Sequence, residues 1–224
     1  MAVNSPALTS LDVMRDAPVI PVIVIHDLAQ AVPLARALVA GGIRMLEVTL
    51  RTPQGLAAIK AIARAVPEAV PGAGTVRSAA EVQTVVDAGA RFAVSPGYTH
   101  GIGRAARDAG LPLLPGVSTG SEILQAQEDG YGELKFFPAL QAGGAAMLKA
   151  WHGPFGDVRF CPTGGISPSN AAEFLSLPNV ECVGGSWLTP ADALAAGDWN
   201  RITTLARAAA ELPRRSQAAP AQKV

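Results

Sequence analysis

The stretch Val19–Leu50, VIPVIVIHDLAQAVPLARALVAGGIRMLEVTL, contains the unit on which the fold depends. It begins with an apolar run, Val19–Ile25, continues through an alanine- and leucine-rich segment, Leu28–Ala40, and ends in a second apolar run, Met45–Leu50. Short apolar runs are typical of buried strands, and the longer segment between them is typical of a helix that ends at Gly41. Because parallel neighbouring strands need a crossover connection, the order strand, helix, strand predicts a parallel pair.

The same unit recurs along most of the chain. Eight apolar runs, often closed by Gly, Pro, Ser or Thr, are Val19–Ile25, Met45–Leu50, Val70–Gly74, Phe92–Ser95, Leu113–Pro115, Leu134–Phe137, Arg159–Pro162 and Glu181–Val183. Helical segments between them include Leu28–Ala40, Gln54–Val66, Ala79–Ala88, Ile102–Ala109, Ser121–Gln127 and Pro168–Leu175. Eight such units can close into a (β/α)8 TIM barrel, and 224 residues lie at the short end of its length range. An open doubly wound α/β sheet is the alternative, but no GxGxxG motif follows the first run.

The chain is predicted to form a single α/β domain over residues 11–210, with a tail at each end. Residues 1–10 are predicted to be a flexible tail, and Ser10 is expected to cap a short N-terminal helix that runs to Arg15. Residues 211–224 are rich in Pro, Ala, Gln and charge without an apolar period, which predicts a disordered tail.

Composition argues against several classes of protein. Because 18 Lys and Arg balance 18 Asp and Glu, neither a nucleic acid nor a membrane surface is an expected partner. The longest apolar run, Pro18–Ile25, is too short to cross a bilayer. The two cysteines, Cys161 and Cys182, lie in apolar runs and are expected to be reduced and buried, as in a cytoplasmic protein. The spacing of His and acidic residues suggests no metal site, and no cofactor is expected.

Two ionisable residues lie inside apolar runs, where a charge is costly. Lys135 stands in ELKFFP (Glu133–Pro138), and Glu47 stands in MLEVTL. A lysine shielded from water can provide the neutral amine that attacks a carbonyl carbon, and a buried carboxylate can move the protons that imine formation requires. The structural alternatives are a lysine whose ammonium reaches water and a glutamate in an ordinary ion pair.

The ends of the apolar runs provide candidate binding groups, because the active face of a barrel gathers the carboxyl ends of its strands. Arg51 follows the second run with a guanidinium that matches a carboxylate, and Thr75 ends the third run with a hydroxyl and a backbone N–H. Glycine-rich turns, Thr163–Ser167 and Gly184–Trp187, follow the seventh and eighth runs, where barrel enzymes often bind phosphate. A local ion pair for the arginine and ordinary tight turns for the glycines are the alternatives.

Seven motifs taken together resemble the 2-keto-3-deoxy-6-phosphogluconate (KDPG)/4-hydroxy-2-oxoglutarate (KHG) aldolase family. They stand in the order and spacing of that family, within Leu11–Leu205: EVTLRTP (Glu47–Pro53), GAGTV (Gly72–Val76), SPG (Ser95–Gly97), LPGV (Leu114–Val117), KFFPA (Lys135–Ala139), PTGGI (Pro162–Ile166) and GGSW (Gly184–Trp187). The resemblance implies a class I aldolase that cleaves KDPG to pyruvate and glyceraldehyde 3-phosphate through a lysine Schiff base. It also allows cleavage of KHG to pyruvate and glyoxylate.

The resemblance further implies a role for each matching residue. Lys135 corresponds to the Schiff-base lysine, and Glu47 to the general acid/base. Keto-acid contacts are implied for Arg51, Thr75, Pro96, Phe137 and Thr163, and phosphate contacts for Gly164, Gly165, Gly185 and Ser186. The implied partners are a phosphorylated 2-keto acid and pyruvate, and the family is typically a cytoplasmic homotrimer of the Entner–Doudoroff route.

Other functions stay open on the sequence alone. An aldolase of the same mechanism for the galactonate isomer of KDPG would use the same residues. A phosphosugar isomerase or epimerase barrel would share the phosphate turns but form no imine, and a barrel without catalytic activity would only bind phosphorylated metabolites.

Overall fold

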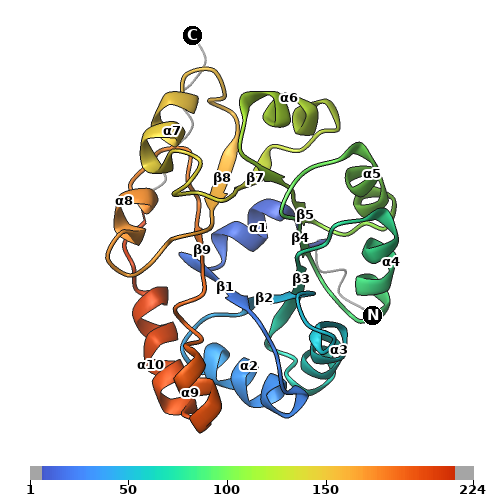
Figure 1. The fold of residues 1–224 in the computed structure, drawn as a ribbon, viewed down its shortest axis with the longest axis vertical. Helices are drawn as coiled ribbons and strands as arrows, with labels where there is room; N and C mark the ends of the chain where they lie inside the picture. The colour runs from blue at the N-terminus through green and yellow to red at the C-terminus, as the bar shows by residue number, and fades with distance from the viewer. Residues whose placement is uncertain (1–6, 215–224) are drawn as a thin grey trace, which may run out of the picture.

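Parallel strands form the centre of the fold, and helices surround them (Figure 1). The computed structural model describes residues 7–214. Its strands are β1 (Val19–Ile23), β2 (Met45–Thr49), β3 (Val70–Gly74), β4 (Ala93–Val94), β5 (Leu113–Leu114), β6 (Gly116–Val117), β7 (Glu133–Phe136), β8 (Arg159–Pro162) and β9 (Val183–Gly185). They pair in the orders β5-β4-β3-β2-β1-β9 and β6-β7-β8. The predicted α/β class is therefore confirmed as a curled parallel sheet in two hydrogen-bonded parts.

The two parts of the sheet meet at β5 and β6 and again near β8 and β9. The run expected as one fifth strand, Leu113–Pro115, is divided, because β5 pairs with β4 whereas β6 pairs with β7. Pro115 lies at the division, where its missing N–H cannot continue a ladder, while its carbonyl accepts a hydrogen bond from the Lys135 amide at 2.9 Å. Isolated parallel bridges, Phe160↔Val180 and Thr163↔Gly184, connect β8 with the segment that contains β9.

Helices lie between most successive strands, as the repeated unit predicts, and further helices precede the first strand and follow the last. They are α1 (Ser10–Arg15), the 3-10 helix η1 (Leu28–Gln30), α2 (Ala31–Ala40), α3 (Gly55–Ala65), α4 (Ala79–Asp87), α5 (His100–Asp108), α6 (Gly120–Glu128), α7 (Gly144–Trp151), α8 (Ala171–Leu175), α9 (Ala191–Ala196) and α10 (Trp199–Ala210). Three of them, α7, α9 and α10, were not among the segments predicted above. Each predicted helical segment is present. Leu28–Ala40 keeps its predicted bounds as η1 followed by α2, and the others have one or both ends shifted.

The short N-terminal helix is confirmed, but its cap is not the predicted one. Thr9 is the N-cap: its hydroxyl accepts from the Asp12 amide at 3.1 Å, and the Asp12 carboxylate accepts from the Thr9 amide at 2.9 Å. Ser10 instead donates its hydroxyl to the Leu113 carbonyl at 3.1 Å. Since Thr9 is followed by an acidic residue at the third helical position, it completes a reciprocal capping pair that Ser10 cannot make.

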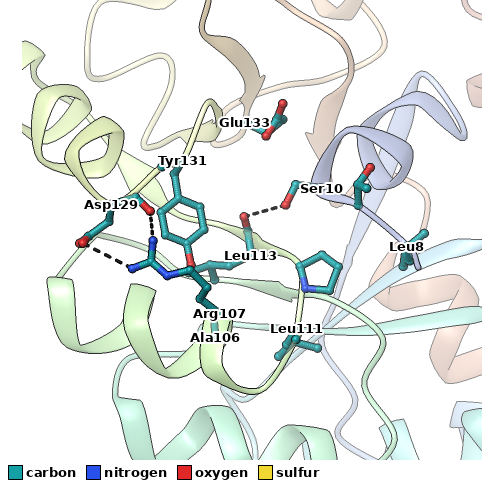
Figure 2. Close-up of a pocket in the computed structure, with 13 residues that line it drawn as sticks. Leu8, Ser10, Ala106, Arg107, Leu111, Leu113, Asp129, Tyr131 and Glu133 are labelled. Atoms are coloured by element: carbon teal, nitrogen blue, oxygen red, sulfur yellow. Dashed lines mark hydrogen bonds and ion pairs between the residues drawn. The ribbon is translucent and has the colours of Figure 1, made fainter. Parts of the chain in front are cut away.

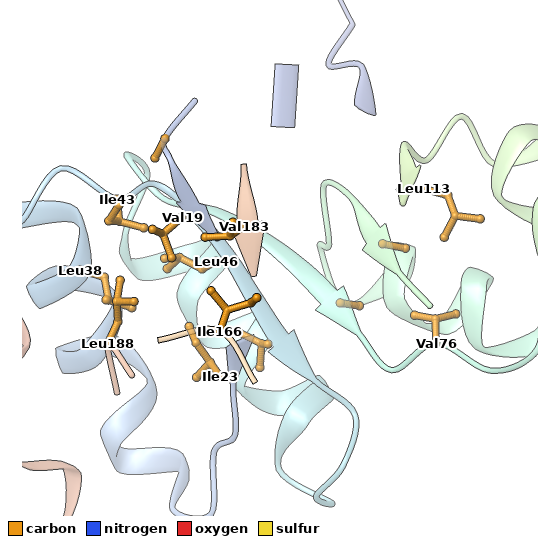
Figure 3. Close-up of a cluster of buried hydrophobic side chains, with 14 of the residues drawn as sticks. Val19, Ile23, Leu38, Ile43, Leu46, Val76, Leu113, Ile166, Val183 and Leu188 are labelled. Carbon is orange, nitrogen blue, oxygen red and sulfur yellow. The ribbon is translucent and has the colours of Figure 1, made fainter. Parts of the chain in front are cut away.

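Apolar side chains form two clusters, one on each side of the sheet. The larger cluster lies between the strands and the outer helices and includes Val19, Leu46 and Leu38 (Figure 3). The smaller cluster lies inside the curve of the sheet, where Val13 and Met14 of α1 pack with strand side chains that include Ile20, Met45, Val94, Leu114 and Cys161. Hydrogen bonds from α1 reach Leu113 and Glu181, near the amino ends of β5 and β9. The helix therefore covers the amino ends of the strands and leaves their carboxyl ends for a site.

Further sequence predictions concern the two cysteines and the two tails. Cys161 and Cys182 are free and buried, as expected. The predicted tails lie mainly outside the described residues, since only residues 7–10 and 211–214 of them are described. Within residues 7–214, no helix has the length and hydropathy to cross a bilayer. The same residues contain no group of three or more His, Cys, Asp and Glu placed to hold a metal ion.

Candidate active site

Lys135 and Glu47 meet inside the curved sheet although they lie 88 positions apart in the chain. Lys135 belongs to β7 and Glu47 to β2, so the two side chains approach each other from different parts of the sheet. The Nζ atom donates to Oε1 at 3.3 Å, and each side chain is only 3% exposed. A buried ion pair is expensive to desolvate and is weak evidence for a stabilising role. The position of the Glu47 carboxylate, next to an amine that can act as a nucleophile, instead fits a role in proton transfer.

Gly74 provides the space that the Glu47 side chain occupies. A Cβ at Gly74 would lie 2.4 Å from Oε1 and 2.6 Å from Cγ of Glu47. Gly72, two residues earlier on the same strand face, makes the same kind of space for the Phe92 ring. Within the motif GAGTV, the sequence analysis assigned a role only to Thr75. It missed the role of the two glycines, which is to leave space for neighbouring side chains.

Arg51 and Thr75 are also brought together, at the carboxyl ends of β2 and β3. The Arg51 Nε donates to the Thr75 hydroxyl at 3.2 Å, and the guanidinium is exposed. Thr75 has φ of 64°, in the left-handed region that a β-branched residue seldom adopts. Such conformations persist where the surroundings enforce them, and they cluster at functional sites. Only the Nε–H is used in this bond, so the two Nη atoms keep the paired donors that match a carboxylate.

Phe137 lies close to the lysine, and Pro96 lies beside the neighbouring strand β6. The Phe137 ring centroid is 5.0 Å from the Lys135 Nζ atom. Pro96 packs against Gly116, whose added Cβ would lie 2.4 Å from the Pro96 carbonyl carbon, and Gly116 is the register partner of Lys135. The sequence analysis did not assign Ser95, whose buried hydroxyl donates to the Gly97 carbonyl at 2.7 Å and accepts from the Gly116 amide at 3.3 Å.

The two glycine-rich turns lie side by side. Thr163 forms a bridge with Gly184, and a Cβ at Gly184 would lie 2.2 Å from the Thr163 hydroxyl. The first turn contains Gly164 (φ +103°) and Gly165 (φ +76°) in the left-handed region that favours glycine. In the second turn the Trp187 ring covers Gly185, whose added Cβ would lie 2.0 Å from it. The third residue of that turn, Ser186, is exposed. The structure therefore joins Thr163 and both predicted phosphate turns in one region, next to the strand ends.

A separate pocket of about 540 Å³ lies at the amino ends of β5 and β7, away from these residues (Figure 2). Its charged side chains include Arg107 and Asp129, which pair with each other. The carboxylate of Asp129 also accepts hydrogen bonds from Tyr98 and His100, and the Tyr98 bond is the main cause that lowers the pKa of Asp129 to about 2. The Asp129 carboxylate in this pocket is thus already paired with Arg107, Tyr98 and His100, and the residues that line the pocket include no lysine. The candidate active site is therefore the one around Lys135.

Comparison with known proteins identifies the family to which the sequence is similar. Residues 11–205 match the family model described as KDPG and KHG aldolase. The 2-dehydro-3-deoxy-phosphogluconate aldolase of Pseudoalteromonas atlantica is 56% identical over 90% of this chain and 94% of the relative. The KHG/KDPG aldolase of Escherichia coli K12 is 55% identical over 89% of this chain and 93% of the relative.

A solved structure shares the fold in detail. It is the KDPG aldolase of Legionella pneumophila with pyruvate captured as a covalent carbinolamine intermediate. The TM-score is 0.89 at 49% identity, over 91% of this chain and 98% of that chain.

Proposed function

The chain belongs to the KDPG and KHG aldolase family, and on that premise we propose that its buried Lys135 carries out the class I aldolase reaction. The enzyme cleaves KDPG to pyruvate and glyceraldehyde 3-phosphate through a lysine Schiff base. The observation that carries the assignment of residues is the 3.3 Å contact between the Lys135 amine and the Glu47 carboxylate, both shielded from water. An amine alone can form an imine, but the later steps of the reaction each move a proton. A carboxylate in contact with the amine can act as the general acid and base for these steps.

The first half of the reaction forms the imine. Lys135 first passes a proton to the Glu47 carboxylate, and the resulting neutral amine adds to C2 of the keto acid. A proton then moves from the nitrogen to the former carbonyl oxygen, which gives a carbinolamine. Glu47 supplies the proton with which that hydroxyl leaves as water. The resulting protonated imine draws electrons away from C3, which prepares the bond between C3 and C4 for cleavage.

The second half breaks the carbon–carbon bond and frees the lysine. Glu47, now a carboxylate, accepts the proton of the C4 hydroxyl, the C3–C4 electron pair moves toward the imine, and glyceraldehyde 3-phosphate departs. The enamine of pyruvate that stays on Lys135 takes up at C3 the proton that Glu47 has accepted. Water then adds at C2, and pyruvate leaves with regeneration of the amine.

The remaining predicted residues are proposed to orient the substrate around this pair. Arg51 and Thr75 hold the carboxylate of the keto acid, a role supported by their hydrogen bond and by the free paired donors of the guanidinium. Pro96, Phe137 and Thr163 line the pocket, and Gly164, Gly165, Gly185 and Ser186 hold the phosphate. Binding the far phosphate helps to fix the reacting bond near the lysine, which contributes to rate as well as to affinity.

The same site is proposed to accept KHG, because one relative at 55% identity is named KHG/KDPG aldolase. KHG has no phosphate, so it would use the carboxylate and imine contacts without the glycine turns. Cleavage rates on KDPG, its galactonate isomer and KHG, measured side by side, test whether KDPG is the preferred substrate and whether KHG is accepted. A faster rate on the galactonate isomer than on KDPG would contradict the assigned substrate.

Trapping the imine with borohydride tests the mechanism. Incubation with pyruvate and borohydride should leave a stable adduct on Lys135, identified by peptide mass spectrometry, whereas an isomerase, an epimerase or a binding barrel would gain none. Lys135→Ala should fold and lose both the adduct and cleavage. An adduct on another lysine, or full activity of Lys135→Ala, would contradict the mechanism.

The overall architecture is proposed to be one closed (β/α)8 barrel over residues 11–210, with tails on either side. Counting β5 and β6 as the two halves of one strand gives eight strands, and the bridge Thr163↔Gly184 supports closure between β8 and β9. We further propose a cytoplasmic homotrimer that serves the Entner–Doudoroff route. Light scattering tests the trimer, whose mass should be three times that of the 22.9 kDa chain.

A further inference from the structure

The loop after β2 is fastened to β1 by two threonine hydroxyls. Thr49 donates to the Ile23 carbonyl at 2.9 Å, and Thr52 donates to the Ile25 carbonyl at 2.5 Å. The regular pairing of β1 with β2 reaches only as far as Ile23↔Val48. The Thr52 hydroxyl therefore continues the connection between the two chain segments beyond the point where the backbone ladder stops.

Arg51 lies between these two anchors and is also connected to the neighbouring strand β3. The amide of Leu50 donates to the Gly74 carbonyl at 2.9 Å, and the Arg51 Nε atom donates to Thr75 at 3.2 Å. The loop is thus held toward β1 by Thr52 and toward β3 by Leu50 and the arginine itself. An exposed arginine loses considerable side-chain freedom when it binds a ligand. If its backbone is already anchored, less conformational entropy is lost on binding.

We propose that Thr52 is a positioning residue, whose hydrogen bond to the Ile25 carbonyl sets the place from which Arg51 reaches the carboxylate of the keto acid. This inference rests on the proposed function, because it assumes that Arg51 holds this carboxylate. Thr52 is the informative member of the pair of threonines. Thr49 is fully buried within β2, two residues from Glu47, so its loss would disturb the catalytic pair as well.

The hydroxyl can be tested separately from the shape of the side chain. Thr52→Val keeps the branched shape but removes the donor, and Thr52→Ser keeps the donor. Because the carboxylate is held both before and during the reaction, loss of its alignment should weaken binding more than it slows the chemical step. For Thr52→Val we expect KM for KDPG, and the pyruvate concentration that gives half-maximal borohydride trapping, to rise about five- to tenfold. We expect kcat to stay within about twofold, and Thr52→Ser to return KM to near the wild-type value.

Thr203→Val is the matched control. Thr203 is half-buried like Thr52, and its hydroxyl also donates to backbone carbonyls, those of Ala37 and Trp199, each at 3.0 Å. It joins α10 to α2 on the outer side of the fold. Loss of this hydroxyl should lower the unfolding temperature without a change in KM. The comparison separates a general loss of stability from a displaced arginine.

A double-mutant cycle completes the test. In the background of Arg51→Ala, the further change Thr52→Val should raise KM by less than about twofold, since there is no guanidinium left to position. The inference is overturned if Thr52→Val changes KM no more than Thr203→Val does, if Thr52→Ser fails to restore KM, or if the two effects simply add. Absence of any pyruvate adduct in the unaltered enzyme would overturn the proposed function as well, so the two failures give different results.

Discussion

Gly74→Ala would place one methyl group against the carboxylate of Glu47. The added Cβ would lie 2.4 Å from Oε1, 2.6 Å from Cγ and 2.9 Å from Cδ, whereas ordinary contacts begin at 3.4 Å. The carboxylate would therefore have to move by about 1 Å, the difference between 3.4 and 2.4 Å. Gly74 is paired with Thr49 in the sheet, so its backbone cannot move away without disturbing that pairing.

A shift of this size should reduce the rate more than it reduces stability. Misplacing a reacting group by 1 Å can cost about 100-fold in rate. Overpacking by one methyl group costs about 1–3 kcal/mol, which a domain with about 5–15 kcal/mol of stability tolerates. We therefore expect Gly74→Ala to stay folded and to lose about two orders of magnitude in kcat. The amine of Lys135 is still present, so pyruvate should still be trapped by borohydride, but more slowly.

The assay is the release of pyruvate followed with a coupled dehydrogenase, together with urea unfolding of the same preparation. Gly132→Ala is the control, because a Cβ at Gly132 meets no atom within 4 Å, and the residue precedes β7 at the end of the sheet away from the catalytic pair. It should keep the wild-type kcat. If folded Gly74→Ala keeps kcat within about threefold of wild type, the position of Glu47 does not limit the reaction, and its proposed role is wrong.

Three further predictions concern proton transfer, acid stability and the thiols. Glu47→Gln should slow turnover strongly while some imine is still trapped on the lysine; an unchanged kcat would remove the residue from proton transfer. The hydrogen bond from Tyr98 helps to lower the pKa of Asp129 from 3.8 to about 2, so the folded state gains stability from this carboxylate above pH 3.8 and loses it as the pH falls toward 2. The urea midpoint of wild type should therefore fall more steeply over this range than that of Asp129→Asn, and parallel curves would contradict the assignment. Both thiols are buried, and burial raises the pKa of the Cys182 thiol. At pH 8 a thiol reagent should therefore modify Cys161 and Cys182 only after denaturant is added, and rapid reaction of the folded protein would count against their burial.

The repeating strand–helix pattern predicted the class of fold because its signal is local. Val70–Gly74 and Arg159–Pro162 have the bounds that their apolar runs predict. The predicted strand Glu181–Val183 instead extends over Val183–Gly185, because the glycines there pair with β1, and a run of apolar letters contains no mark of that pairing. The division at Pro115 was missed for a similar reason: a proline at the end of a run predicts a strand end, but not that the chain changes partners there.

The candidate site was predicted in part because it consists of two kinds of residue. Lys135 and Glu47 were recognisable because a charge inside an apolar strand is costly and so needs an explanation. Gly74 and Thr52 carry no such signal. A glycine within a strand, or a threonine that follows a strand, can occur for many structural reasons. Only the contact of Gly74 with Glu47 and that of Thr52 with the Ile25 carbonyl, seen in three dimensions, give these two residues a specific role.

The energetics of the buried pair favour a functional origin over a stabilising one. Placing Lys135 and Glu47 where each side chain is 3% exposed removes two charges from water, a cost that their attraction often fails to recover fully. Apolar residues of similar size would serve the same core as well or better, since replacing buried pairs in this way is often neutral or stabilising by about 1–4 kcal/mol. The neighbouring glycines point the same way, because Gly74 gives up side-chain packing to make room for the carboxylate. A sequence selected for stability alone would have apolar side chains at both positions. The chain keeps an amine and a carboxylate in contact inside its curved sheet. A reaction that first forms a bond to a ketone carbon and then moves several protons requires this arrangement.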